Sequence, residues 1–271
     1  MNIVSPLIPL TNSEIPHNQT ISYKNYFLLR WHFLCSCPRC ADGTADGSLA
    51  GLVCLQCPKS SGTILPQRPL DPTSPWECRK CNAKITAAEA ESRVDKVAAT
   101  LDKVPRTDLV RLESFLKAAG KVLHPQHSVL LEVKRMLFFL YGSAPGYTQT
   151  ELSEEQMLRK LALGEEYIAA VSRVDPGLTK WRGQILYESN KIKLVKSLQD
   201  LQTRKIGVEG FLQELTKSTS ELEEAVAGML GSPVSPPKGL RDRLKALTKV
   251  ELLGPGYAQI LGIVIGLPFV Q

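Results

Sequence analysis

The sequence predicts an α+β protein, in which short strands and a cysteine-rich, zinc-binding segment precede an α-helical C-terminal domain. Three observations indicate this fold class. Short β-type runs occupy residues 1 to about 34, and all seven cysteines lie between positions 35 and 81. From Ile85 onward the apolar residues recur at helical spacing instead. The length of 271 residues allows one medium domain or two small ones.

Composition narrows the class of protein. With 43% hydrophobic and 22% charged residues, the chain resembles ordinary globular proteins. The net charge of +6 comes from scattered basic residues, so a solvated surface is favoured over a nucleic-acid site. The N-terminus lacks the features of a signal peptide, and the apolar run 258–270 is too short to span a bilayer. We therefore expect an intracellular protein, in the nucleus or cytoplasm, without a membrane partner.

The expected organisation has four segments. Apolar residues among prolines, and then Gln19 to Tyr23, predict short strands at the N-terminus. A segment rich in Gly, Pro and Ser follows and holds every cysteine. The four segments are a strand segment (1–34), the cysteine-rich segment (35–84), a helical domain (85–253) and an apolar tail without an assigned role (254–271).

Two cysteine pairs have the spacing of a zinc ribbon. Cys54 and Cys57 form one CxxC motif, and Cys78 and Cys81 form another after 20 intervening residues. Each CxxC turn presents two thiolates on one knuckle, and two facing knuckles make a tetrahedral site. The residues between them, from Gly62 to Glu77, are long enough for strands that return the second knuckle to the first. Because four cysteines leave no open coordination position, the expected role of this zinc is structural.

A second group of cysteines is an incomplete site. Cys35, Cys37 and Cys40 supply three thiolates, and His32 stands three residues earlier, where it could supply the fourth ligand. An alternative set would combine the last two thiols of this triple with the first pair of the ribbon. It is less favourable because it leaves three cysteines without a site.

Seven amphipathic helices of 12 to 24 residues are expected after Ile85. The first opens with a capping-box spacing, Thr86 to Glu89, and Pro105 stops it. A second stripe runs from Leu109 to Leu123, and a third helix has Pro125 in its first turn and Gly142 at its end. His124 and His127 flank that proline, where a structural role in the turn is favoured over metal binding.

The boundaries of the remaining helices are also predicted from capping and helix-breaking residues. The fourth opens at Ser153 with another capping-box spacing and ends before Asp175. The fifth, sixth and seventh are expected at 178–201, 208–230 and 240–253. Short loops suggest stacked hairpins, as in tetratricopeptide-type arrays, although no clean 34-residue repeat is visible and a plain bundle fits equally well. No GxSxG, P-loop, GxGxxG or HExxH motif supports those catalytic classes.

Several short motifs, in order along residues 14 to 250, resemble the SET-and-MYND family of protein-lysine methyltransferases, in its arthropod branch. Glu14 to Tyr23 followed by Phe33 to Cys40 resembles the end of a SET domain with its post-SET cysteine cluster. The other segments similar to this family are Gly62–Pro66, Pro69–Asp71, Ser74–Cys78, Leu123–His127, Leu140–Gly142 and Pro176–Glu188.

The resemblance implies a function and residue roles. Tyr23 would match the tyrosine that lines the lysine channel, and Phe33 would match the aromatic residue beside the S-adenosylmethionine cofactor. Cys35, Cys37 and Cys40 would bind the post-SET zinc. The implied reaction is methyl transfer from S-adenosylmethionine to a lysine amine of a protein substrate, a histone or another protein.

The chain departs from the family in its cofactor-binding half. The glycine-rich S-adenosylmethionine loop, the Asn-His pair, the core zinc cysteine and the MYND finger belong upstream of residue 14. We therefore expect the C-terminal part of such an enzyme, without its own cofactor site. The alternative is a non-catalytic module of zinc ribbon and helical repeat that binds protein partners, and direct nucleic-acid binding ranks last.

Overall fold

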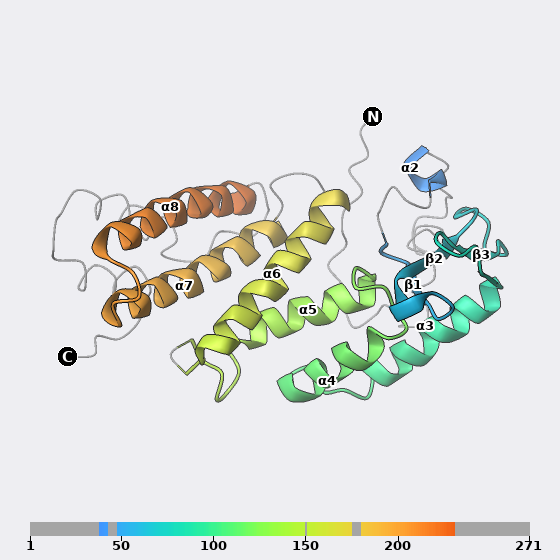
Figure 1. The fold of residues 1–271 in the computed structure, drawn as a ribbon, viewed down its shortest axis with the longest axis horizontal. Helices are drawn as coiled ribbons and strands as arrows, with labels where there is room; N and C mark the ends of the chain where they lie inside the picture. The colour runs from blue at the N-terminus through green and yellow to red at the C-terminus, as the bar shows by residue number, and fades with distance from the viewer. Residues whose placement is uncertain (1–37, 43–47, 150, 175–179, 231–271) are drawn as a thin grey trace. The chain divides into compact units, whose positions relative to one another are not determined.

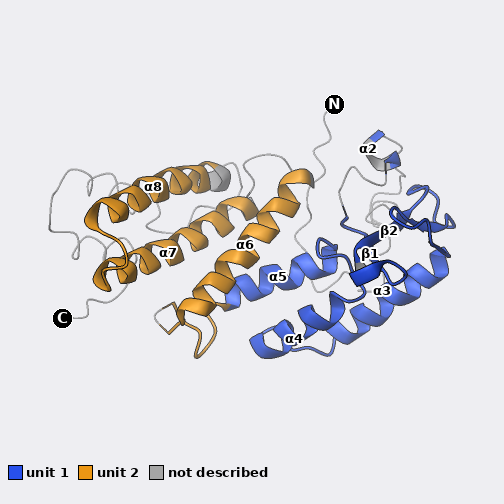
Figure 2. Ribbon diagram, viewed as in Figure 1, with its two compact units in different colours: residues 1–140 blue, residues 141–271 orange. Residues whose placement is uncertain are grey.

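The computed structural model describes residues 38–42, 48–149, 151–174 and 180–230 (Figure 1). Within them it is an α+β structure of one small antiparallel sheet and six helices of eleven or more residues, besides the single turn α2 (Pro38–Ala41). Contacts divide the chain into two compact units, and the boundary in the sequence lies between Leu140 and Tyr141 (Figure 2). No helix in the described part is long and apolar enough to cross a membrane.

The first unit contains the four-stranded sheet, in the order β1-β2-β3-β4. Each strand pairs antiparallel with the next, so the sheet is a meander of short strands. The strands are β1 (Leu52–Cys54), β2 (Gly62–Pro66), β3 (Trp76–Cys78) and β4 (Lys84–Ile85). These bounds confirm the strands expected between the two CxxC motifs.

The loop between two helices extends this sheet on the β1 side. Leu52 forms an antiparallel bridge with Leu123, and both side chains are fully buried. The Val53 amide donates to the Val122 carbonyl oxygen (2.8 Å), and the His124 amide donates to the Gly51 carbonyl oxygen (2.9 Å). These backbone bonds tie the cysteine-bearing sheet directly to the helices that follow it in sequence.

Three helices complete the first unit: α3 (Ala87–Leu101), α4 (Leu109–Ala119) and α5 (Ser128–Leu140). The capping box expected at the start of α3 is present, since Thr86 and Glu89 exchange side chain-to-backbone hydrogen bonds. The expected stripe of α3 is buried as far as Leu101, where the helix ends ahead of Pro105. Asp108 caps α4 through the Arg111 amide.

Two helix boundaries in this unit were predicted wrongly. Leu123 continues the apolar spacing of α4, but it lies beyond the helix, in the backbone pairing with β1. The third helix begins at Ser128 rather than at Pro125, because residues 124–127 form a turn whose first amide, that of His124, donates to Gly51, directly before β1. The Pro125 carbonyl oxygen accepts a hydrogen bond from the Lys134 ammonium group instead of serving the helix ladder.

The second unit consists of α6 (Glu154–Val174), α7 (Lys180–Gln202) and α8 (Val208–Leu230), in which α7 packs against both neighbours (Figure 1). The expected capping box at Ser153 and Gln156 is present. The bounds of α8 are those predicted from the apolar pattern. Before α6, Gly142 ends the preceding helix with a φ of +109°, a conformation that favours glycine.

Several predictions lie outside the described residues. They are the N-terminal strands, the seventh helix and the apolar tail. Cys40 lies in the one-turn helix α2, and nothing further is described of its side chain. Within the units, α4 packs against α5, and α7 packs against α6 and α8. These contacts suit both a repeat array and a bundle, so the choice between them stays a prediction.

Candidate metal centre

The first cysteine knuckle follows directly from the end of β1. Cys54 is the last residue of the strand, and the chain turns through Leu55 and Gln56 to bring back Cys57. A 3-10 turn, Pro58–Ser60, then reverses the chain into β2, with Lys59 in the left-handed region at φ 52°. Strand pairing of Cys54 with Gly62 closes this knuckle on itself.

The second knuckle is built in the same way at the end of β3. The Cys78 amide donates to the Ala83 carbonyl oxygen, and Asn82 takes a left-handed φ of 58° to allow the tight return. Arg79 donates its amide to the Thr63 carbonyl oxygen, which places the second knuckle against β2. The Lys80 amide points at the Cys78 sulfur at 3.4 Å, an outer contact of the kind that orients metal ligands.

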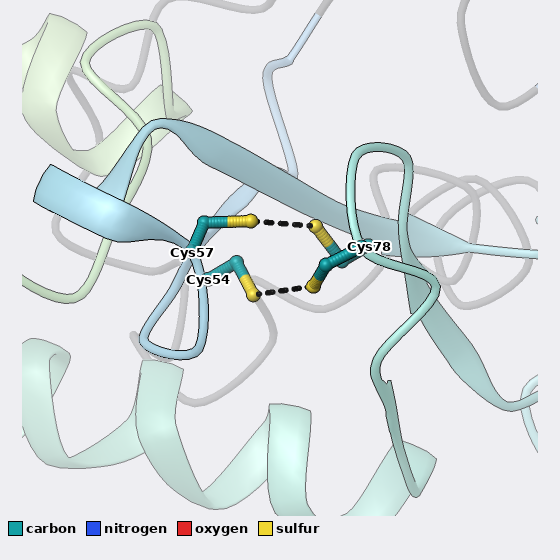
Figure 3. A group of neighbouring side chains, drawn as sticks. Cys54, Cys57 and Cys78 are labelled. Atoms are coloured by element: carbon teal, nitrogen blue, oxygen red, sulfur yellow. Dashed lines mark hydrogen bonds between the residues drawn. The ribbon is translucent and has the colours of Figure 1, made fainter.

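The two knuckles bring all four sulfur atoms together. The Sγ atoms of Cys54 and Cys81 are 3.6 Å apart, and those of Cys57 and Cys78 are 3.7 Å apart (Figure 3). All four lie within 4.8 Å of one another and could hold a metal ion. Zinc–sulfur bonds of ~2.3 Å in a tetrahedron place neighbouring sulfurs about 3.8 Å apart. The two observed Sγ–Sγ distances therefore match the edges of a tetrahedral site that holds a single zinc ion.

Three of the four cysteines of the cluster are shielded from water. Cys54, Cys57 and Cys78 are buried, whereas Cys81 is exposed, and none of the four forms a disulfide. Burial raises the pKa of the Cys57 thiol to about 12, and its thiol neighbours add to that rise. Burial also pushes the pKa of Cys78 upward, but backbone hydrogen bonds from Cys81 and Lys80, together with the thiols of Cys54 and Cys81, lower the pKa to about 7. A cation between the four sulfurs would favour their thiolate forms together.

Gly62 is a residue of this centre that spacing alone did not reveal. A Cβ atom at this position would lie 2.5 Å from the Cys57 sulfur and 2.7 Å from the Cys78 sulfur. The glycine backbone therefore forms one wall of the sulfur cluster, where no side chain fits. Its place directly after the first knuckle, at the start of β2, is the only sequence signal of this role.

The histidines near Pro125 take no part in the cluster. His127 is buried, and its Nδ1 accepts a hydrogen bond from the Val129 amide at 3.2 Å. The Nδ1 of His124 accepts similarly from the Gln126 amide. Both rings thus organise the turn before α5, and the four cysteines are the group of potential metal ligands found within the described residues.

Five other expected site residues belong to the N-terminal part of the chain. Tyr23, His32, Phe33, Cys35 and Cys37 lie outside the described residues. The four cysteines that converge are the set favoured from spacing, rather than the alternative that borrows thiols from the triple.

Fold and site together define a class of protein: a small α+β protein whose antiparallel sheet carries a closed, four-cysteine centre and leads into helices. A comparison with known protein families finds no family model that matches the chain.

Proposed function

We propose that the four cysteines hold a structural zinc ion, which fixes the sheet of the first unit in a chain that binds protein partners. The sulfur geometry carries this proposal, because the two close Sγ pairs match the edges of a zinc tetrathiolate. Among the described residues, the ligand atoms that converge on the centre are four cysteine sulfurs, a donor set that suits zinc better than magnesium or calcium. With four protein ligands the ion has no position left for water or substrate.

The connections of the cluster support a role in folding. β1 supplies the first cysteine of the site, and its Val53 amide donates to the α4–α5 loop, while Gly51, directly before the strand, accepts from that loop. Metal at the cysteines therefore constrains β1 and β3 and, through the bridge between Leu52 and Leu123, the loop that joins α4 to α5. Structural zinc sites contribute roughly 10–16 kcal/mol of apparent binding energy to folding.

Metal analysis of the full chain, purified without chelator, tests this proposal. We expect bound zinc and, by X-ray absorption at the zinc edge, four sulfur ligands at about 2.3 Å. Cys54→Ser should abolish that four-sulfur signature, whereas Cys40→Ser leaves it unchanged as the matched control. A wild-type protein without zinc would sink the proposal, and so would a signature lost equally in both variants.

We also propose, as a second candidate, that the chain is the C-terminal part of a SET-and-MYND protein-lysine methyltransferase. The ordered motifs from Glu14 to Glu188 support it, and they include the segments on either side of the metal centre. In this reading Tyr23 and Phe33 would face the substrate and S-adenosylmethionine, and the post-SET triple would hold a second zinc. Two zinc ions per chain would favour this reading.

Calorimetric titration of the zinc-loaded chain with S-adenosylmethionine tests whether this chain by itself has the cofactor site of the second candidate. The interaction module binds its partner without the cofactor and gives no heat of cofactor binding. Saturable cofactor binding, lost in Phe33→Ala and retained in Phe139→Ala, would instead favour the methyltransferase. Failure to bind the cofactor excludes catalysis by this chain alone and leaves both the family resemblance and the zinc proposal standing.

A further inference from the structure

The tips of the two knuckles form an exposed surface of unusual composition. Leu55, at the tip of the first knuckle, is 68% exposed, the highest value for a large apolar residue within the described part of the chain. Lys59 follows the first knuckle, while Arg79 and Lys80 form the tip of the second, and all three are exposed. We call these four residues the knuckle surface.

The metal centre holds this surface together. The sulfurs that flank the two tips lie within 4.8 Å of one another, so the two tips meet at the same cluster. The Lys80 ammonium group also donates to the Ser61 hydroxyl at 2.7 Å, which links the second tip to the chain just after the first. The knuckle surface is therefore composed of two tips that meet at one cluster, although Leu55 and Lys80 are 25 residues apart in the sequence.

The charge of the knuckle surface is unbalanced. The segments 54–61 and 78–82 contain three cations and no acidic residue. None of the three forms an ion pair within the described residues, whereas Lys84 and Arg68 nearby pair with Glu77 and Asp71. A zinc tetrathiolate carries two negative charges, which three neighbouring cations more than offset. The patch consequently keeps positive charge for a partner.

The chemistry of the patch favours one class of partner. Phosphate-binding surfaces for single-stranded nucleic acid add aromatic side chains on which bases stack, but the single aromatic residue between positions 51 and 86, Trp76, is buried. Leu55 instead offers an apolar contact among the cations. An acidic peptide segment with an aliphatic residue complements both features, because its carboxylates face the cations while its apolar side chain covers Leu55.

We propose that the knuckle surface docks an acidic segment of a partner protein, anchored by an aliphatic side chain on Leu55. This proposal rests on the structural zinc, since the ion holds the two tips together. It gives the protein-binding function a site: the partner is recognised at the metal centre itself.

Fluorescence anisotropy on the zinc-loaded full chain tests the docking site. The probe is a labelled peptide of about a dozen residues, with Asp and Glu around a central Leu. We expect saturable binding that weakens as salt rises. The double variant Arg79→Glu and Lys80→Glu should weaken it at least about tenfold, and Leu55→Ala should weaken it by up to about tenfold. The matched controls, Lys103→Glu with Lys121→Glu and the exposed Leu158→Ala, should bind as the wild type does.

Three outcomes would overturn the docking site. The first is an absence of peptide binding to the zinc-loaded wild type, and the second is tighter binding of a single-stranded or duplex oligonucleotide. The third is loss of zinc from the double variant, because the cations would then serve the metal centre instead of a partner. Zinc content measured on every sample separates this failure from failure of the structural zinc, which would appear already in the wild type.

Discussion

Gly62 provides the sharpest test of how the metal centre is built. Substitution of this glycine by alanine adds a single methyl group at the wall of the sulfur cluster. That methyl carbon would stand 2.5 Å from the Cys57 sulfur and 2.7 Å from the Cys78 sulfur. Non-bonded carbon contacts normally begin at about 3.5–4.0 Å, so the methyl group intrudes by about 1 Å on two ligands at once.

The size of the expected effect follows from this overlap. A buried overpacking of one methyl group costs about 1–3 kcal/mol when the surroundings have to shift. Here the atoms that have to shift are the ligand sulfurs and the start of strand β2. The substitution therefore destabilises the metal-bound state. Converted to affinity, Gly62→Ala should weaken zinc binding about 5- to 150-fold.

Competition between the full chain and a chelator of known zinc affinity measures this change. The matched control is Gly207→Ala, because a Cβ atom there meets no other atom within 4 Å. The control should release zinc at the same chelator concentration as the wild type. A zinc affinity of Gly62→Ala within about twofold of the wild type would refute the claim that residue 62 lies in close contact with the ligand sulfurs. A cost of 1 kcal/mol already corresponds to about fivefold in affinity.

Three further predictions concern buried polar groups. Burial and the nearby His124 lower the pKa of His127 to about 3 in the folded protein. When the pH falls below the ordinary histidine pKa of 6.5, the unfolded chain binds more protons than the folded chain, so acid destabilises the fold. Urea unfolding should lose about 2 kcal/mol between pH 7.5 and 5, and His127→Gln should remove that loss. Burial lowers the pKa of Lys160 to about 8, so stability should rise by about 2 kcal/mol from pH 8 to 10, and Lys160→Met should abolish this rise. The buried Asn190 donates to the Ser218 carbonyl oxygen but leaves its own oxygen unpartnered within the described residues. Asn190→Leu should therefore raise the free energy of unfolding by about 1 kcal/mol, and a lower thermal midpoint would contradict this reasoning.

Much of the centre could be predicted because its signals are local. Each CxxC motif closes within four residues, so the spacing itself defines a knuckle, and the long interval between the motifs requires strands to bring them together. The capping boxes at Thr86 and Ser153 are equally local and are present in the structure. Features of this kind depend on a few neighbouring residues, and the pattern therefore determines them.

The errors arose where a residue serves a distant partner. Leu123 has the spacing of a helical stripe, and a buried leucine satisfies a helix and a sheet equally well. Its bridge with Leu52 depends on residues about seventy positions away, which local periodicity does not encode. The late start of α5 has the same origin, because the amides of His124 and Ser128 donate to the segment directly before β1, at Gly51 and Leu49.

The sequence by itself determined that four cysteines would form two knuckles and that amphipathic helices would follow them. Only the tertiary structure decided that the α4–α5 loop pairs with β1, that Gly62 lies against the sulfur cluster, and that Leu55 at the tip of a knuckle is exposed. The physical reason is the range of the interactions. Ligand spacing and helix capping act within a turn of chain, whereas close packing and surface exposure depend on which distant segments come together.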